Sequence, residues 1–113
     1  MLLGVGDLAD AVRAATAEAV EQVAGTVGVI APLRVTDAVP GWLVGVAGLE
    51  TAGDRIIVVD PISAKGLEFD AAVVVAPEEI IGESPTGLRA VYVALTRATQ
   101  RLTVVSTASD PLG

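Results

Sequence analysis

The apolar residues of this chain fall into short runs separated by glycine, proline and charge. Residues 26–31, 55–60, 71–76 and 101–106 are rich in valine and isoleucine. Apolar runs of about four to eight residues are typical of strands. The runs at 55–59 and 71–76 are nearly continuous, which predicts strands that are buried on both faces of a parallel sheet.

Helical spacing of apolar residues appears on either side of these strands. Residues 7–24 carry an apolar stripe, with Asp7 as a candidate cap, and Gly25 is a plausible stop. Ser84-Pro85-Thr86 is typical of a helix start, and this second helix is expected to run to about Ala98. Residues 77–83 predict a turn with a short helical piece. One helix is therefore expected before the first strand run, and another between the third and the last.

Residues 39–49 give the weakest pattern. Apolar residues recur there at helical spacing, but one proline and several glycines interrupt them. The segment predicts a short helix. Because few polar residues surround Trp42, the segment is also a candidate exposed apolar surface.

The order of elements is helix, strand, uncertain helix, strand, loop, strand, helix and strand. The connections are too long for hairpins, so a mainly parallel sheet flanked by helices is expected. We therefore predict a single α/β domain, layered as helix, sheet and helix, over residues 1–113.

Composition excludes several classes of function. The chain has no cysteine and no histidine, so it can form no disulfide, no thiolate or imidazole metal site, and no imidazole base. The net charge of −7, with seven basic residues scattered singly, argues against strong nucleic-acid binding by the chain alone. No apolar run is long enough for a membrane span, and no secretory signal is visible, so a cytoplasmic location is expected.

The segment from Ala64 to Asp70 is the first candidate for chemistry. It contains the chain's one lysine, Lys65, followed by Gly66, Glu68 and Asp70. Charged groups at the end of a buried strand are costly unless they serve a polar partner. Taken singly, each has a plainer explanation: the carboxylates could solvate a loop, and Gly66 could be a turn glycine.

The segment from Val91 to Arg101 is the second candidate. Thr96 and Arg97 lie near the predicted end of a helix that is otherwise apolar. An arginine at this position could simply complement the helix dipole. Guanidinium is also well suited to phosphate. We interpret Arg89 and Arg101 as surface charges.

Together these two segments resemble motifs V and VI of superfamily 1 helicases of the UvrD/Rep type. Ala-Lys-Gly-Leu-Glu-Phe-Asp is similar to motif V, and Tyr-Val-Ala-Leu-Thr-Arg-Ala, some twenty residues later, is similar to motif VI. The resemblance covers residues 55–106 and is nearest to the branch that holds helicase IV and the HelD proteins. It implies a RecA-like fold, related to the P-loop NTPases, and the second (2A-type) lobe of a helicase motor.

The resemblance also implies roles for individual residues. Arg97 would reach the γ-phosphate of ATP and neutralise charge in the transition state. Glu68 would accept a hydrogen bond from the ribose, and Gly66 would let the backbone approach the nucleotide. Lys65 would lie near phosphate or set the loop. Tyr92 and Thr96 would support Arg97, although Tyr92 could equally be a core residue.

The chain departs from the family pattern in two ways. It has no Gly-x-x-x-x-Gly-Lys-Ser/Thr loop, so ATP and Mg²⁺ would be bound mainly by an N-terminal RecA-like lobe that is not in this chain. Asp60 and Ile62 replace a threonine and a histidine that help to hold single-stranded DNA in many relatives.

These departures predict a fragment of a larger ATPase that acts on DNA or on RNA polymerase. The alternative is a degenerate lobe that serves as a protein-interaction module through residues 39–49.

Overall fold

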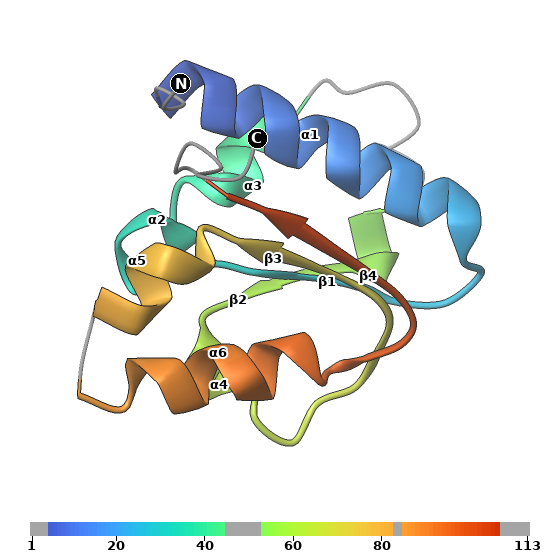
Figure 1. The fold of residues 1–113 in the computed structure, drawn as a ribbon. Coiled ribbons are helices and arrows are strands. Elements are labelled where there is room, and N and C mark those ends of the chain that lie inside the picture. Colours follow the sequence, from blue (N-terminus) through green and yellow to red (C-terminus); the bar gives the residue numbers. More distant parts are fainter. Residues whose placement is uncertain (1–4, 45–52, 83–84, 107–113) are drawn as a thin grey trace, which may run out of the picture.

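The computed structural model describes residues 5–44, 53–82 and 85–106, and within them one parallel sheet forms the centre of the molecule (Figure 1). Its strands lie in the order β2-β1-β3-β4. Val29 of β1 is paired with Val58 on one side and with Val73 on the other. The strands are β1 (Val27–Ile30), β2 (Ile56–Val59), β3 (Phe69–Val75) and β4 (Ala98–Val105).

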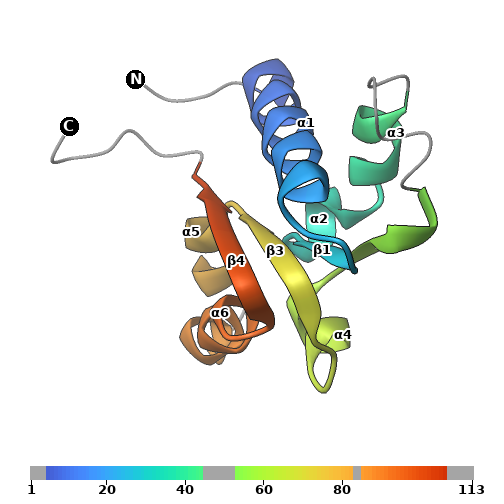
Figure 2. The same cartoon turned by 90° about the vertical axis from the view of Figure 1, so that its right-hand side faces the viewer.

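One face of the sheet is covered mainly by the long helix α1 (Val5–Gln22) (Figures 1 and 2). Two short helices, α2 (Leu33–Thr36) and α3 (Val39–Leu43), complete this layer. Val12 of α1 and Val73 of β3 are fully buried in the cluster between them. The apolar stripe predicted for residues 7–24 therefore forms one side of this core.

The opposite face is covered by three short helices (Figure 2). These are α4 (Pro61–Ala64), α5 (Pro77–Gly82) and α6 (Gly87–Leu95), and a 3₁₀ turn, η1 (Gly53–Arg55), leads into β2. Phe69 and Val74 of β3 pack there against Ile80 of α5 and Ala94 of α6. The predicted three-layer α/β fold is confirmed.

Burial of the strands differs from the prediction at one edge. β1 and β3 are almost entirely buried, but β2 is largely half-buried, because it forms an edge of the sheet within the described residues. The prediction that β2 is buried on both faces is therefore wrong. A run of apolar residues does not reveal where its strand lies in the sheet.

Several predicted boundaries also move. Asp7 lies inside α1 rather than at its cap, because the helix already includes Val5. Phe69 and Asp70 belong to β3 instead of the preceding loop. α6 has Thr86 at its N-cap, which puts Pro85 ahead of the helix, and it ends at Leu95, three residues short of Ala98. The short helix expected within residues 77–83 is confirmed as α5.

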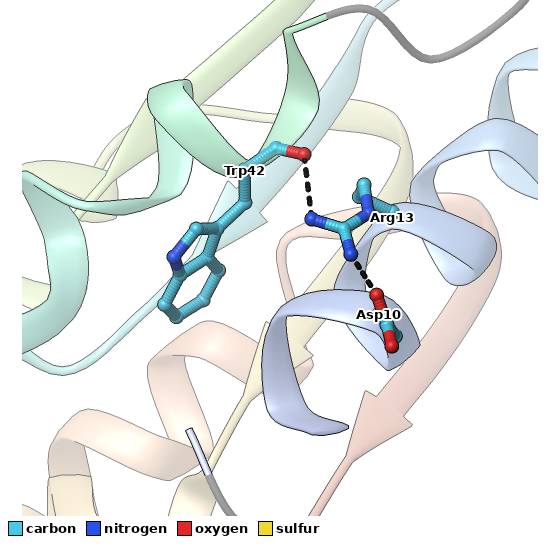
Figure 3. Close-up of polar contacts among 3 residues, drawn as sticks. All are labelled: Asp10, Arg13 and Trp42. Atoms are coloured by element: carbon cyan, nitrogen blue, oxygen red, sulfur yellow. Dashed lines mark hydrogen bonds and ion pairs between the residues drawn. The ribbon is translucent and has the colours of Figure 1, made fainter. Parts of the chain in front are cut away.

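The predicted helix within residues 39–49 is confirmed as α3, since Pro40 occupies its first turn, where a missing N–H is tolerated. Its predicted exposure is found only in part over the described residues, since Val44 is 79% exposed and Trp42 is half-buried. Val39 is fully buried, and Trp42 packs against the core cluster. Arg13 donates from Nη1 to the Trp42 carbonyl at 3.3 Å and pairs with Asp10 (Figure 3). Residues 45–49 lie outside the described residues.

Arg55 joins η1 to the end of α1. Its Nε donates to the Gly25 carbonyl at 2.8 Å, and its Nη2 donates to the carbonyls of Val23 at 2.5 Å and Val20 at 3.3 Å. The last carbonyls of a helix have no partner within it, so Arg55 satisfies groups that would otherwise need water.

Among the helices of the described ranges, none has the length and apolar character needed to cross a membrane.

Candidate functional site

The two sequence segments meet at the amino ends of β3 and β4. The Phe69 N–H donates to the Arg97 carbonyl at 2.9 Å, and Phe69 is paired with Ala98 at the start of the β3–β4 ladder. The loop before β3 is thereby held beside the turn that follows α6. Ligands of open α/β sheets usually bind at the carboxyl ends of the strands. This junction lies at the other, amino ends of β3 and β4.

The Arg97 side chain bridges these two segments. Its Nε donates to the Val93 carbonyl at 3.1 Å, its Nη1 to the Leu67 carbonyl at 3.3 Å, and its Nη2 to Thr96 Oγ1 at 3.3 Å. A guanidinium has five N–H donors. Three are used here, which leaves one donor on each terminal nitrogen, and Arg97 remains partly exposed.

Within the part of the chain that the structure describes, Arg97 forms no ion pair with a carboxylate. The helix end and the Leu67 carbonyl therefore hold a net positive group in place. A guanidinium with a free donor on each terminal nitrogen can donate to oxygens of a phosphate or a carboxylate. The arrangement can bind and orient an anion.

Thr96 and Tyr92 support Arg97 in different ways. Thr96 Oγ1 accepts the Arg97 bond and lies 2.9 Å from the Val93 carbonyl, to which it donates. Tyr92 contributes its backbone carbonyl to the Thr96 N–H at 3.2 Å, and its ring is 69% exposed. The alternative that Tyr92 is a core residue is wrong.

Gly66 and Glu68 lie on either side of Leu67 in the exposed loop that leads to β3. Gly66 has a φ of +86°, a region that side chains rarely adopt, and a Cβ there would meet nothing within 4 Å. Space for a ligand therefore lies beside its backbone. Glu68 is exposed, and its carboxylate has no hydrogen bond or ion pair to another described residue.

Lys65 and Asp70 point elsewhere. Lys65 lines a cleft of about 270 Å³ between α4 and α6. Asp70 lies against the turn after α1, because a Cβ on Gly25 would overlap the Asp70 carboxylate. The structure thus brings together Gly66, Leu67 and Arg97, and it separates Asp70 from them.

Asp60 has a structural role that the sequence interpretation missed. Its carboxylate caps α4 by accepting from the Ile62 N–H at 3.1 Å, the Ser63 N–H at 3.3 Å and the Ser63 hydroxyl at 2.5 Å. Burial opposes ionisation, but these hydrogen bonds outweigh it and hold the pKa of Asp60 below its ordinary value. Asp followed by Pro61 at the first helical position was the signal for this cap.

A metal site is not formed by the described residues, which include no group of three or more potential ligands. The site is therefore a cationic point, a glycine with open space and an exposed carboxylate at one edge of the sheet.

Comparisons with known proteins agree with the fold. Residues 57–105 match the model of the UvrD-like helicase C-terminal domain family. Over 98% of its length the chain is similar to the C-terminal domain of a possible DNA helicase from Lactobacillus plantarum WCFS1, at 24% identity and a TM-score of 0.69, covering 74% of that chain. A comparison with curated proteins gave no match. The RecA-like fold is confirmed, and the family match spans both Gly66 and Arg97.

Proposed function

We propose that this chain is the second motor lobe of a superfamily 1 helicase-like ATPase and that it completes an ATP site built mainly by another lobe. The observation that carries the proposal is the bond from Arg97 to the Leu67 carbonyl, because it joins the two segments that resemble motifs V and VI. The family match over residues 57–105 supports a helicase motor lobe.

In this proposal the unused donors of Arg97 bind the γ-phosphate and stabilise the charge that develops on its oxygens. Glu68 accepts a hydrogen bond from the ribose, and the open side of Gly66 admits the nucleotide beside the backbone. Lys65 adds positive charge to the same loop. Mg²⁺ and most of the phosphate contacts belong to the N-terminal RecA-like lobe, since this chain has no Walker A loop.

The proposal makes residues 1–113 a 2A-type lobe of a longer, cytoplasmic protein. Closure of the two lobes on ATP would then drive movement on DNA or remodelling of an RNA polymerase complex. Asp60 and Ile62, where many relatives carry DNA-binding side chains, favour the polymerase branch that includes the HelD proteins. ATP turnover measured with single-stranded DNA and with RNA polymerase separates the two.

The competing function, a non-catalytic interaction module that uses residues 39–49, is weakened by the burial of Val39 and the packing of Trp42. A Walker A loop elsewhere in the same protein would support the ATPase. Its absence there would support a module.

The direct test is Arg97→Ala in a protein that carries both lobes. ATP turnover should fall by about 10³-fold while nucleotide affinity changes little, because the arginine acts mainly on the transition state. Arg97→Lys should recover only part of the loss, since an ammonium lacks the paired donors. Arg101→Ala, at an exposed position of β4, is the matched control. Unchanged turnover in Arg97→Ala would refute the assignment.

A further inference from the structure

A groove runs between α4 and α6 on the face opposite α1. The cleft of about 270 Å³ that contains Lys65 is continuous with a smaller one of about 100 Å³, since both are lined by Pro61, Ile62, Thr86 and Ala90. Leu33 extends the smaller cleft at its far end. The groove is therefore longer than either cleft alone.

The walls of this groove are mainly apolar. Pro61 and Ile62 come from α4, and Ala90 and Val93 come from α6. Ile62 is 74% exposed and Leu33 is 59% exposed, although both are large aliphatic side chains. An apolar group that entered the groove would remove both from water.

Two cationic side chains border the same groove. From the sequence, the basic residues are scattered singly along the chain. Three of the seven basic residues are used within the fold: Arg13 by Asp10 and Trp42, Arg55 by the end of α1, and Arg97 by Leu67. By contrast, Lys65 and Arg89 line the groove and make no ion pair with another described residue. This is a local concentration of positive charge on a chain of net charge −7.

We propose that this groove binds a short acidic and apolar peptide segment of a partner protein. One apolar side chain of the segment lies between Ile62 and Val93, and its carboxylates pair with Lys65 and Arg89. At the other end, the Asp60 carboxylate is occupied by its bonds to Ile62 and Ser63. The charge pattern therefore fixes the direction of the segment, with its acidic end toward Lys65.

A peptide fits these residues better than a nucleic acid does. Single-stranded nucleic acid is held by aromatic side chains that stack on bases and by cations along the whole backbone. The residues that line the two clefts of the groove include no aromatic one. Tyr92 lines a neighbouring cleft that shares Thr86 and Arg89 with the groove, Trp42 packs on the α1 face, and Phe69 is buried. Two cations suffice for one or two carboxylates, whereas a polyphosphate would meet the remaining negative charge.

The proposal shares Lys65 with the loop of the proposed nucleotide site, but its test does not depend on that site. The test uses Ile62, Arg89 and Val93, none of which contacts Arg97 through its side chain. ATP turnover can therefore fail to depend on Arg97 while the groove still binds its peptide, and the reverse also holds.

The test is a selection of short random peptides on the 113-residue chain, followed by affinity measurements on the enriched sequences. Enriched peptides should carry an apolar residue flanked by aspartate or glutamate. Their affinity should fall by about tenfold or more in Arg89→Glu and in Ile62→Asp, both exposed positions. Arg101→Glu makes the same charge change on β4 and should leave affinity unchanged.

Amide chemical shifts that move around Ile62, Lys65, Arg89 and Val93 on peptide addition would place the contact. The proposal is overturned by a lack of enrichment, by enriched peptides that are basic, or by affinity that Arg89→Glu and Arg101→Glu lower equally. It is also overturned if oligothymidylate binds the groove more tightly than the selected peptides.

Discussion

The two faces of the sheet share one inner layer and differ in what covers it. On the α1 side one long helix, completed by α2 and α3, covers the layer that contains Val73. On the other side α4, α5 and α6 cover the layer that contains Val74, and both valines are fully buried. On the α1 side, Arg13 donates to the Trp42 carbonyl and pairs with Asp10, and Arg55 donates to carbonyls at the end of α1. On the other side, Lys65, which follows α4, and Arg89 of α6 have no ion pair among the described residues.

This difference separates stability from binding. Charged side chains that already form hydrogen bonds within the α1 face should contribute to the free energy of unfolding. Groups left over on the α4 and α6 face, and at the amino ends of β3 and β4, should matter for ligands. The predictions below test that division, beginning with the inner layer, where both faces should be equally intolerant.

Gly28→Ala should have the largest effect on stability. A Cβ on Gly28 of β1 would overlap the Phe69 ring, which is 2% exposed and cannot move into solvent. We expect a loss of about 3 kcal/mol in the free energy of unfolding, typical of an overpacked core. Gly41→Ala is the matched control: a Cβ there meets nothing within 4 Å, and replacing a helical glycine should stabilise by about 0.5 kcal/mol. Equal effects in urea unfolding would contradict this packing.

Arg55→Ala should cost about 2 kcal/mol of unfolding free energy, because it removes charged donors from three carbonyls at the end of α1. The comparison with Arg101→Ala sharpens the division between faces. Arg101 is exposed on β4, so its loss should change stability by less than about 0.5 kcal/mol. A negligible loss in Arg55→Ala would show that water can cap α1 equally well.

Asp60→Ala should have the smallest effect, about 1 kcal/mol at neutral pH, through loss of the α4 cap. Because the folded pKa of Asp60 lies below the ordinary 3.8, its stabilisation is present above that pH and is lost as the pH falls through the folded value. The difference between wild type and variant in urea unfolding should therefore shrink as the pH falls below 3.8. A difference that stays constant with pH would contradict the ionised cap.

The sequence predicted the layers well and the edges poorly. Periodicity located every strand, because burial imposes its own pattern on apolar residues. It could not place β2 at an edge, since strand order depends on contacts between distant segments. Arg55 was missed for a similar reason: a single arginine before an apolar run gives no sign that α1 ends beside it.

The candidate site shows the same limit. The two motif-like segments identified Arg97 and Gly66 as residues to examine, and the bond from Arg97 to the Leu67 carbonyl joins those segments in space. The convergence of Lys65 and Arg89 was not predicted, because they are far apart in the sequence and meet only when α4 packs beside α6. Asp70, grouped with Glu68 by sequence, lies beside Gly25 because it belongs to β3, whereas Glu68 belongs to the loop before that strand.

The most direct test of the account is a structure of a protein that carries both lobes, with a non-hydrolysable ATP analogue bound. The account predicts that a terminal nitrogen of Arg97 lies within about 3 Å of a γ-phosphate oxygen and that its bond to the Leu67 carbonyl is kept. If the nucleotide is bound with its phosphates in contact with the other lobe alone and Arg97 facing solvent, the proposed function of this lobe is wrong.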